Sequence, residues 1–199
     1  MTVNLRSFRR KVKFHRSALR RWLSRIAKLP PHRIAVLVGD ADRHPRPLAE
    51  EELRDARAQH VAVAQRRHRD AEMECLARAV YFEARSESEL GQLAVAKVIL
   101  NRTKDPNFPK TICGVVYQGS GSRNSCQFSF ACDGLPDDVK QPKAWENSKR
   151  IARMAMDGNQ SVPAVGTATN YHADYVNPKW AKSMKRLIKI GHHIFYEDS

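Results

Sequence analysis

Residues 71–103 read AEMECLARAVYFEARSESELGQLAVAKVILNRT, and they hold the clearest structural pattern of the chain. Apolar side chains recur at helical spacing in its first half, which predicts a helix over residues 71–85. Ser86 lies three residues before Glu89, a pair that can form a capping box at the start of a second helix. That helix, over residues 90–103, is apolar nearly all round, as buried helices are. The stretch therefore predicts two helices at the core of a domain.

The sequence that follows alternates short helices and β-type segments. Residues 111–118 and 145–156 have apolar side chains at helical spacing. Residues 168–175 and 187–196 are rich in β-branched and aromatic residues, which predicts two strands that pair as a small sheet. The expected fold class is therefore α+β, mostly helical with a small β-sheet.

The first 70 residues differ in composition from the rest. They hold 18 Lys and Arg against 7 Asp and Glu, so most of the net charge of +14 belongs to them. Residues 1–33 have the spacing of a short amphipathic helix, residues 40–48 are linker-like, and residues 48–69 predict an exposed helix or a flexible connector. We expect a basic arm and linker over residues 1–70, partly disordered or helical, and a globular domain over residues 71–199.

A basic arm of this kind is compatible with three roles: a solvated leader, a contact with an anionic envelope, or nucleic-acid binding. The arm has few aromatic residues and no nucleic-acid motif, so no nucleic acid is expected as a partner. No apolar run approaches the roughly 18 residues of a membrane span. The longest run near the N-terminus, Ile34 to Val38, is too short for the core of a signal peptide. The export route is therefore left open.

The four cysteines lie in the globular part, and none forms a C-x-x-C pair, which argues against a zinc knuckle or a thioredoxin-type site. An even number is compatible with two disulfides in an oxidising compartment. Of the three possible connectivities, we expect Cys126–Cys132 to close a short loop and Cys75–Cys113 to join two elements. Four reduced, buried thiols are the alternative.

Glu83 is the sharpest candidate for chemistry. It lies between Phe82 and Ala84, near the end of a predicted helix whose other side chains are expected to be largely buried. Desolvation in such a place raises the pKa of a carboxyl group. A carboxyl group that keeps its proton near neutral pH can act as a general acid. The nearby positive charge of Arg85 lowers the pKa of Glu83 and so opposes the effect of burial. The alternative is that Glu83 lies at the surface and forms an ion pair with Arg85 or Arg78.

Further candidates follow in the second half of the chain. Tyr171 and His172 lie in the first predicted strand, with Asp174 two residues beyond His172 on the same face. His192 and His193 point to opposite faces of the second strand, so at most one lines a given cleft. No segment has the ligand spacing of a common zinc motif, so neither a metal nor another cofactor is expected.

Five segments together resemble a known family. LARAVYFEARSESELGQLAVAKVILNR, PKTICGVVYQ, CQFSFACDG, ATNYHADYVNPKW and IGHHIFY, between about Glu74 and Tyr196, are similar to the SleB/CwlJ-type cell-wall hydrolases, best known from spore-cortex lysis. The resemblance implies a compact lysozyme-like or transglycosylase-like fold that acts on peptidoglycan, with Glu83 as the catalytic glutamate. It also implies a place in the cell envelope or periplasm, which agrees with the cysteines.

The expected reaction is cleavage of the β-1,4 bond between N-acetylmuramic acid and N-acetylglucosamine, with Glu83 as the general acid and base of a lytic transglycosylase. The expected substrate-binding residues are Gln127, Ser129, Asp133, Tyr171 and His172. The alternatives are a hydrolase, for which Asp133 or Asp174 supplies the second carboxylate, and a non-catalytic wall-binding module with a basic arm. The expected partners are glycan strands and, for the arm, an anionic envelope; the protein is expected to be a monomer.

Overall fold

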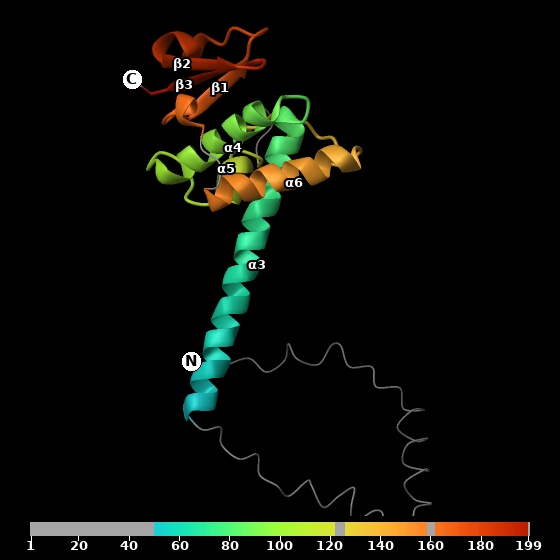
Figure 1. Cartoon of the computed structure of the whole chain (residues 1–199). Coiled ribbons are helices and arrows are strands. Elements are labelled where there is room, and N and C mark those ends of the chain that lie inside the picture. Colours follow the sequence, from blue (N-terminus) through green and yellow to red (C-terminus); the bar gives the residue numbers. More distant parts are fainter. Residues whose placement is uncertain (1–49, 122–125, 159–161, 199) are drawn as a thin grey trace, which may run out of the picture. The chain divides into compact units, whose positions relative to one another are not determined.

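A computed structural model of the chain describes residues 50–121, 126–158 and 162–198 (Figure 1). The chain divides after Ala56 into two compact units. The described residues of the first unit belong to the beginning of one helix, and every other described element lies in the second unit. The segments expected over residues 1–33 and 40–48 lie outside the described residues, and the domain boundary expected at residue 70 stays a prediction.

Helix α3, Glu50–Ala84, is continuous, and it has two halves of different character. Its first half is almost entirely exposed, so the exposed helix expected over residues 48–69 is confirmed from Glu50 onward. Its last turns acquire a buried face, made by Leu76, Ala77, Ala79, Val80, Tyr81 and Ala84. The helix predicted over residues 71–85 is thus the C-terminal part of α3. None of the described helices is both long and apolar enough to span a membrane.

Helix α4, Glu89–Lys104, is buried on nearly every side, as its apolar sequence predicts. Its N-cap is Ser88, whose side-chain oxygen accepts a hydrogen bond from the Gly91 amide at 3.3 Å. The capping box expected from Ser86 is therefore wrong. The chain leaves α3 through a turn in which the amide of Glu87 donates to the carbonyl of Ala84, and Ser86 lies within this turn, two residues before the N-cap of α4.

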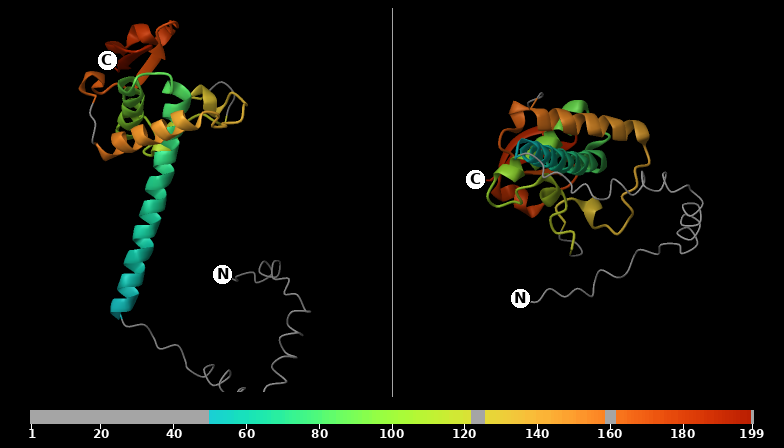
Figure 2. Two further views of the ribbon diagram at one scale, coloured as in Figure 1. Left: turned by 45° about the vertical axis from the view of Figure 1, so that its right-hand side comes forward. Right: turned by 90° about the horizontal axis from the view of Figure 1, so that it is seen from below.

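The remaining helices pack around α4. Helix α5, Ile112–Val116, and helix α6, Pro142–Asp157, both contact α4, and both agree with the helices predicted there. Short 3-10 helices follow at Ser129–Ala131, Pro163–Val165 and Lys179–Ser183. Figure 1 shows α4 between α6 and the sheet, and the views in Figure 2 show the same helices gathered around the C-terminal part of α3.

The sheet has three antiparallel strands: β1, Asn170–Ala173, β2, Lys185–Ile190, and β3, His193–Glu197, in the order β1-β3-β2. The pairing expected between the two β-type segments is confirmed, because Tyr171 of β1 lies opposite Phe195 of β3. The single strand expected over residues 187–196 is wrong. Gly191 has φ +55°, a conformation that glycine adopts without strain, and it turns the chain into a hairpin there. The predicted α+β fold class is confirmed.

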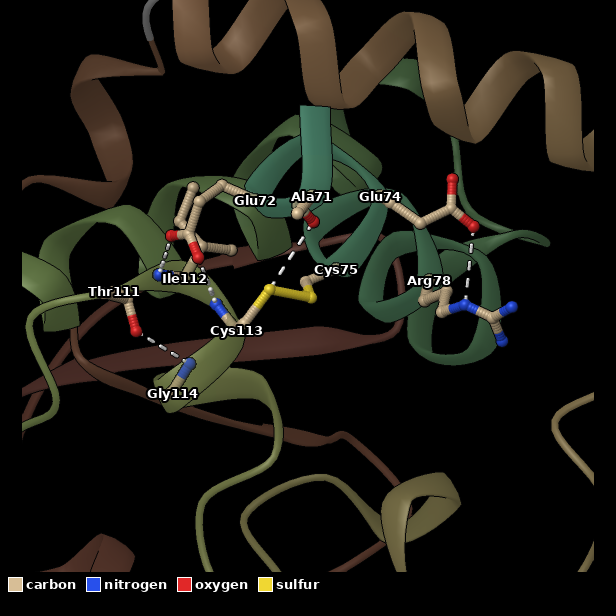
Figure 3. The surroundings of a disulfide bond; sticks show 9 residues. All are labelled: Ala71, Glu72, Glu74, Cys75, Arg78, Thr111, Ile112, Cys113 and Gly114. Carbon is tan, nitrogen blue, oxygen red and sulfur yellow. Dashed lines mark hydrogen bonds and ion pairs between the residues drawn. A yellow bond between two sulfur atoms is a disulfide. The ribbon is translucent and has the colours of Figure 1, made fainter. Parts of the chain in front are cut away.

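Both expected disulfides are present, and Figure 3 shows one of them, Cys75–Cys113. Cys75–Cys113 joins α3 to α5, and Cys126–Cys132 closes a loop of the chain after α5. The carboxylate of Glu72 reinforces the first junction by accepting hydrogen bonds from the amides of Ile112 and Cys113 at the start of α5. The alternative of four reduced thiols is therefore excluded in this structure.

Candidate functional site

Glu83, in the last turn of α3, lines a cleft of about 340 Å³. The cleft is formed by the ends of α3 and α4, by the loop that Cys126–Cys132 closes, and by strands β1 and β3. Its polar lining residues besides Glu83 are Arg102, Gln127, Ser129, Tyr171, His172, Tyr175 and His193. Glu83 is the one carboxylate among the described residues that line it.

Packing at the end of α3 explains why Glu83 is held there. Ala84 is buried in the core on one side of it, while on the other side Phe82 stacks on Phe130 with ring centroids 4.8 Å apart. Phe130 belongs to the disulfide-closed loop, so the loop and the helix end are fixed against each other. The position between these two anchors faces the cleft.

Burial raises the pKa of the Glu83 carboxyl group above its ordinary value, and a hydrogen bond from the Tyr171 hydroxyl lowers it in part. The two oxygen atoms of this bond lie 3.3 Å apart. Burial, and next the nearby charge of Glu83, raises the pKa of Tyr171 well above its ordinary value, so Tyr171 keeps its proton and donates. The shift of Glu83 has the direction that a general acid at neutral pH needs.

The two arginines considered as ion-pair partners of Glu83, Arg85 and Arg78, bind other groups. Arg85 donates to the carbonyl of Tyr81 at 3.3 Å and lies over the Tyr81 ring. Arg78 pairs with Glu74, with 3.5 Å between nitrogen and oxygen. Within residues 50–121, 126–158 and 162–198, Glu83 has no ion-pair partner. The surface ion pair that was the alternative for Glu83 does not form in this structure.

The cleft brings together four of the five expected substrate-binding residues. Tyr171 bonds to Glu83, as described, and Gln127 and Ser129 are exposed at the loop side. Both ring nitrogens of His172 already have partners: the carbonyl of Ala173 at 2.8 Å and the hydroxyl of Tyr196 at 2.9 Å. His172 therefore shapes the wall of the cleft more than it offers free hydrogen bonds.

The two acids considered as a second carboxylate do not line this cleft. Asp133 lines a neighbouring cavity of about 410 Å³, and its carboxylate accepts from the Leu135 amide at 2.8 Å. Asp174 is paired with Lys189 at 2.6 Å and His192 at 3.5 Å. Only one of the two adjacent histidines, His193, lines the cleft, but His192 lies in the turn before β3 and not in a strand, so the expected strand alternation is not the reason.

Arg102 is a lining residue that the sequence interpretation missed. Its side chain is 1% exposed, and its Nε donates to the Thr169 carbonyl at 2.6 Å. The guanidinium lies over the rings of Phe108 and Phe128, at 5.0 and 5.6 Å from the centroids. Burial lowers the pKa of Arg102 to about 10. An arginine in the last turn of a helix is usually a solvated cation that complements the helix dipole, and the polar neighbours Asn101, Thr103 and Lys104 gave no sign that Arg102 is buried.

No three His, Cys, Asp or Glu side chains of the described residues lie close enough together to hold a metal ion. The groups that the cleft presents are a buried carboxyl group with a raised pKa, a tyrosine hydroxyl bonded to it, and further polar side chains along the walls.

Comparison with known proteins points to the same chemistry. Residues 86–196 match the sequence family described as Cell Wall Hydrolase. The spore cortex-lytic enzyme of Halalkalibacterium halodurans is 33% identical over 63% of this chain and 34% of its own length. The cell wall hydrolase CwlJ of Oceanobacillus iheyensis is 26% identical over 65% of this chain and 89% of its own length.

Among solved structures, the catalytic domain of the germination-specific lytic transglycosylase SleB from Bacillus anthracis is 35% identical, with a TM-score of 0.51. The match covers 63% of this chain and 93% of that domain. The chain thus spans only about a third of the length of the curated relative from H. halodurans, but nearly all of a solved catalytic domain. These matches confirm the resemblance found in the sequence motifs, and they confirm the expected enzyme class at the level of the family.

Proposed function

Because this chain belongs to the cell wall hydrolase family, we propose that it cleaves the glycan strands of peptidoglycan as a lytic transglycosylase. The bond cut is the β-1,4 bond between N-acetylmuramic acid and N-acetylglucosamine. The relatives support the substrate class, since their names refer to the spore cortex, to the cell wall and to lytic transglycosylation. Glu83 is the catalytic residue in this proposal.

One observation carries the choice of reaction: Glu83 is the lone carboxylate of its cleft among the described residues. Most glycoside hydrolases use two carboxyl groups, about 5–5.5 Å apart for retention or about 6.5–9.5 Å apart for inversion. Asp133 lies in a different cavity and Asp174 in a surface ion pair, so neither is in place to act as nucleophile or base beside Glu83. A reaction that needs one carboxyl group fits this arrangement better.

The mechanism uses the same carboxyl group twice. Protonated Glu83 first donates its proton to the glycosidic oxygen, and the bond to the muramic acid C1 breaks through an oxocarbenium-like transition state. The carboxylate that remains then removes the proton of the muramic acid 6-hydroxyl while that oxygen attacks C1. A 1,6-anhydro end forms, no water is consumed, and Glu83 recovers its proton.

Tyr171 supports the step between the two proton transfers. Its hydroxyl donates to Glu83 Oε2, so it stabilises the carboxylate form that exists after the first transfer. Gln127, Ser129 and His172 form the walls that hold the strand. Asp133 remains a proposed substrate contact only where a strand extends into the neighbouring cavity, which shares Phe82 with the cleft.

The location of the protein follows from the same proposal. All four cysteines are paired, and disulfides persist in oxidising compartments such as the periplasm. We therefore place the enzyme in the cell envelope, where its substrate lies. The contact of the basic arm with an anionic envelope and the monomeric state stay predictions.

The test is mass spectrometry of the soluble products that purified peptidoglycan releases. It compares the wild type with Glu83→Gln, which removes the acid at nearly constant volume. The matched control is Glu74→Gln, the same substitution on the same helix, in a partly buried pair with Arg78 outside the cleft. We expect 1,6-anhydro-muramic ends from the wild type and the control, and none from Glu83→Gln.

Other outcomes would refute parts of the proposal. Reducing muramic ends would establish hydrolysis and a second carboxylate or water-activating group. Full activity of a folded Glu83→Gln variant would remove Glu83 from the mechanism. Wall that is coated by the wild type but yields no soluble product would mean a wall-binding module.

A further inference from the structure

Two lining residues of the cleft carry buried polar atoms without a hydrogen-bond partner. Four such side-chain atoms occur in the described part of the chain, and two of them, Arg102 Nη1 and His193 Nδ1, belong to residues that line the Glu83 cleft. Arg102 is 1% exposed and His193 is 8% exposed. A buried polar atom without a partner costs free energy, so its place on the wall of a binding cleft points to a ligand group.

The surroundings of Arg102 fix the guanidinium while leaving Nη1 free. Nε donates to the Thr169 carbonyl, and Cζ lies over the rings of Phe108 and Phe128, at 5.0 and 5.6 Å from their centroids. Among the ion pairs of the described residues, none involves Arg102. A charged donor held in this way calls for a strong acceptor oxygen from outside the protein.

His193 offers a complementary group. Its ring packs edge-on against Tyr171, with centroids 5.0 Å apart, which connects it to the residue that bonds Glu83. Burial lowers the pKa of His193, so the neutral imidazole is favoured. A neutral imidazole has one nitrogen that accepts a hydrogen bond and one that donates. The unpartnered Nδ1 can therefore accept an N–H from a ligand.

We infer that Arg102 and His193 form an acetamido-binding subsite, in which Arg102 Nη1 donates to the acetamido carbonyl and His193 Nδ1 accepts the acetamido N–H of a bound sugar. This rests on the proposed function, since it assumes a glycan substrate. Sugar hydroxyls are more abundant on the strand, but an amide carbonyl is its strongest neutral acceptor, and an amide supplies the matching donor. The subsite would make cleavage depend on N-acetylation.

The experiment measures initial rates of muropeptide release by the full chain from matched wall preparations. One is native peptidoglycan, the second is de-N-acetylated, and the third is the de-N-acetylated wall after re-acetylation with acetic anhydride. The quantity of interest is the rate on native wall divided by the rate on de-N-acetylated wall. This ratio is independent of the fraction of folded enzyme, so a merely structural role would not move it.

The wild type is expected to prefer native and re-acetylated wall over de-N-acetylated wall. Arg102→Lys and His193→Phe are each expected to reduce the ratio by about 5- to 150-fold, as the loss of a buried hydrogen bond implies. His193→Asn places a polar atom near the position of Nδ1 and is expected to retain more of the ratio than His193→Phe. If Arg102→Lys does not fold, this histidine pair decides the question alone.

Asn101→Ala is the structural control. The Asn101 side chain donates to the carbonyls of Gly166 and Ala168 at 3.0 and 2.8 Å, so it ties α4 to the same segment as Arg102 does, without lining the cleft. The variant is expected to lower the melting temperature and to leave the ratio unchanged.

Three results would overturn the subsite. The first is equal cleavage of native and de-N-acetylated wall by the wild type, which leaves the proposed function standing. The second is an unchanged ratio in both Arg102→Lys and His193→Phe. The third is an effect of Arg102→Lys that disappears on wall freed of stem peptides by an amidase, which would assign Arg102 to the stem peptide. Failure of the wild type to cleave any wall would instead refute the proposed function.

Discussion

The two disulfides should contribute unequally to stability and to activity, and they allow the fold and the site to be perturbed separately. Cys75 and Cys113 are 38 residues apart in the sequence, whereas Cys126 and Cys132 are 6 apart. The entropy that a cross-link removes from the unfolded chain grows with the logarithm of the loop length. The longer loop is therefore the more stabilising of the two.

The loop lengths set the expected magnitudes. Replacing Cys75 and Cys113 by alanine should lower the free energy of unfolding by about 4 kcal/mol, and replacing Cys126 and Cys132 should lower it by about 2 kcal/mol. Both values come from the same loop-closure relation, which has a part that does not depend on loop length. This part cancels in the difference between the two disulfides, which is about 1.6 kcal/mol. Urea unfolding followed by tryptophan fluorescence measures both free energies.

Activity should show the opposite order. The loop between Cys126 and Cys132 carries Gln127 and Ser129, which line the cleft, while the other disulfide joins α3 to α5 away from it. At a temperature where both double variants are folded, the short-loop variant should lose more muropeptide release than the long-loop variant.

A larger stability loss for the short loop would refute the loop-closure argument. Full activity of the short-loop variant would show that the disulfide does not shape the cleft. The wild type unfolded in the presence of a reductant serves as the control, because it should be at least as destabilised as the long-loop variant.

Three further predictions test single contacts. Tyr171→Phe removes the hydroxyl that lowers the pKa of Glu83, so the pKa of Glu83 should rise. Because Glu83 acts as an acid while it is protonated, the alkaline limb of the pH–rate profile should move to higher pH. An alkaline limb that stays in place or moves to lower pH would contradict the role of Tyr171. Gly191→Ala should destabilise by about 1–2 kcal/mol or more in thermal melts, because φ is +55° and the added Cβ would meet Glu87, and adding Glu87→Ala should recover part of the loss. Glu72→Ala removes the acceptor of two amides at the start of α5 and should cost about 1–2 kcal/mol in urea unfolding, with the ratio of native to de-N-acetylated cleavage unchanged.

The parts of the fold that were predicted correctly depend on the hydrophobic pattern within a single segment of the sequence. The buried helix α4 follows from apolar residues on all its faces, and the exposed start of α3 follows from the lack of an apolar stripe. The hairpin between β2 and β3 was missed because Gly191 lies inside a run of β-branched and aromatic residues that favours one strand. A single backbone conformation, invisible in the hydrophobic pattern, decides between one strand and two.

Sequence patterns indicated several of the residues that line the cleft, but not the contacts between them. Glu83 and Tyr171 are 88 residues apart, and no local pattern indicates that β1 carries the tyrosine to the end of α3. Asp133 and Asp174 were equally plausible partners of Glu83 by composition, and only the fold assigns them to another cavity and to a surface ion pair. Arg102 shows the limit most clearly, since its burial depends on rings contributed by two other segments.

The burial of Glu83 connects the fold to the proposed chemistry. A desolvated carboxyl group is a good proton donor at neutral pH, but the carboxylate it leaves behind is costly in the same environment. The hydroxyl of Tyr171 reduces that cost without abolishing it, because the net pKa shift of Glu83 remains upward. The carboxylate should therefore be short-lived and a strong base, which favours immediate recovery of a proton from the nearest hydroxyl. In the proposed mechanism, the 6-hydroxyl of the bound sugar would meet this requirement, since it returns a proton to the one carboxylate among the described lining residues as the anhydro ring closes.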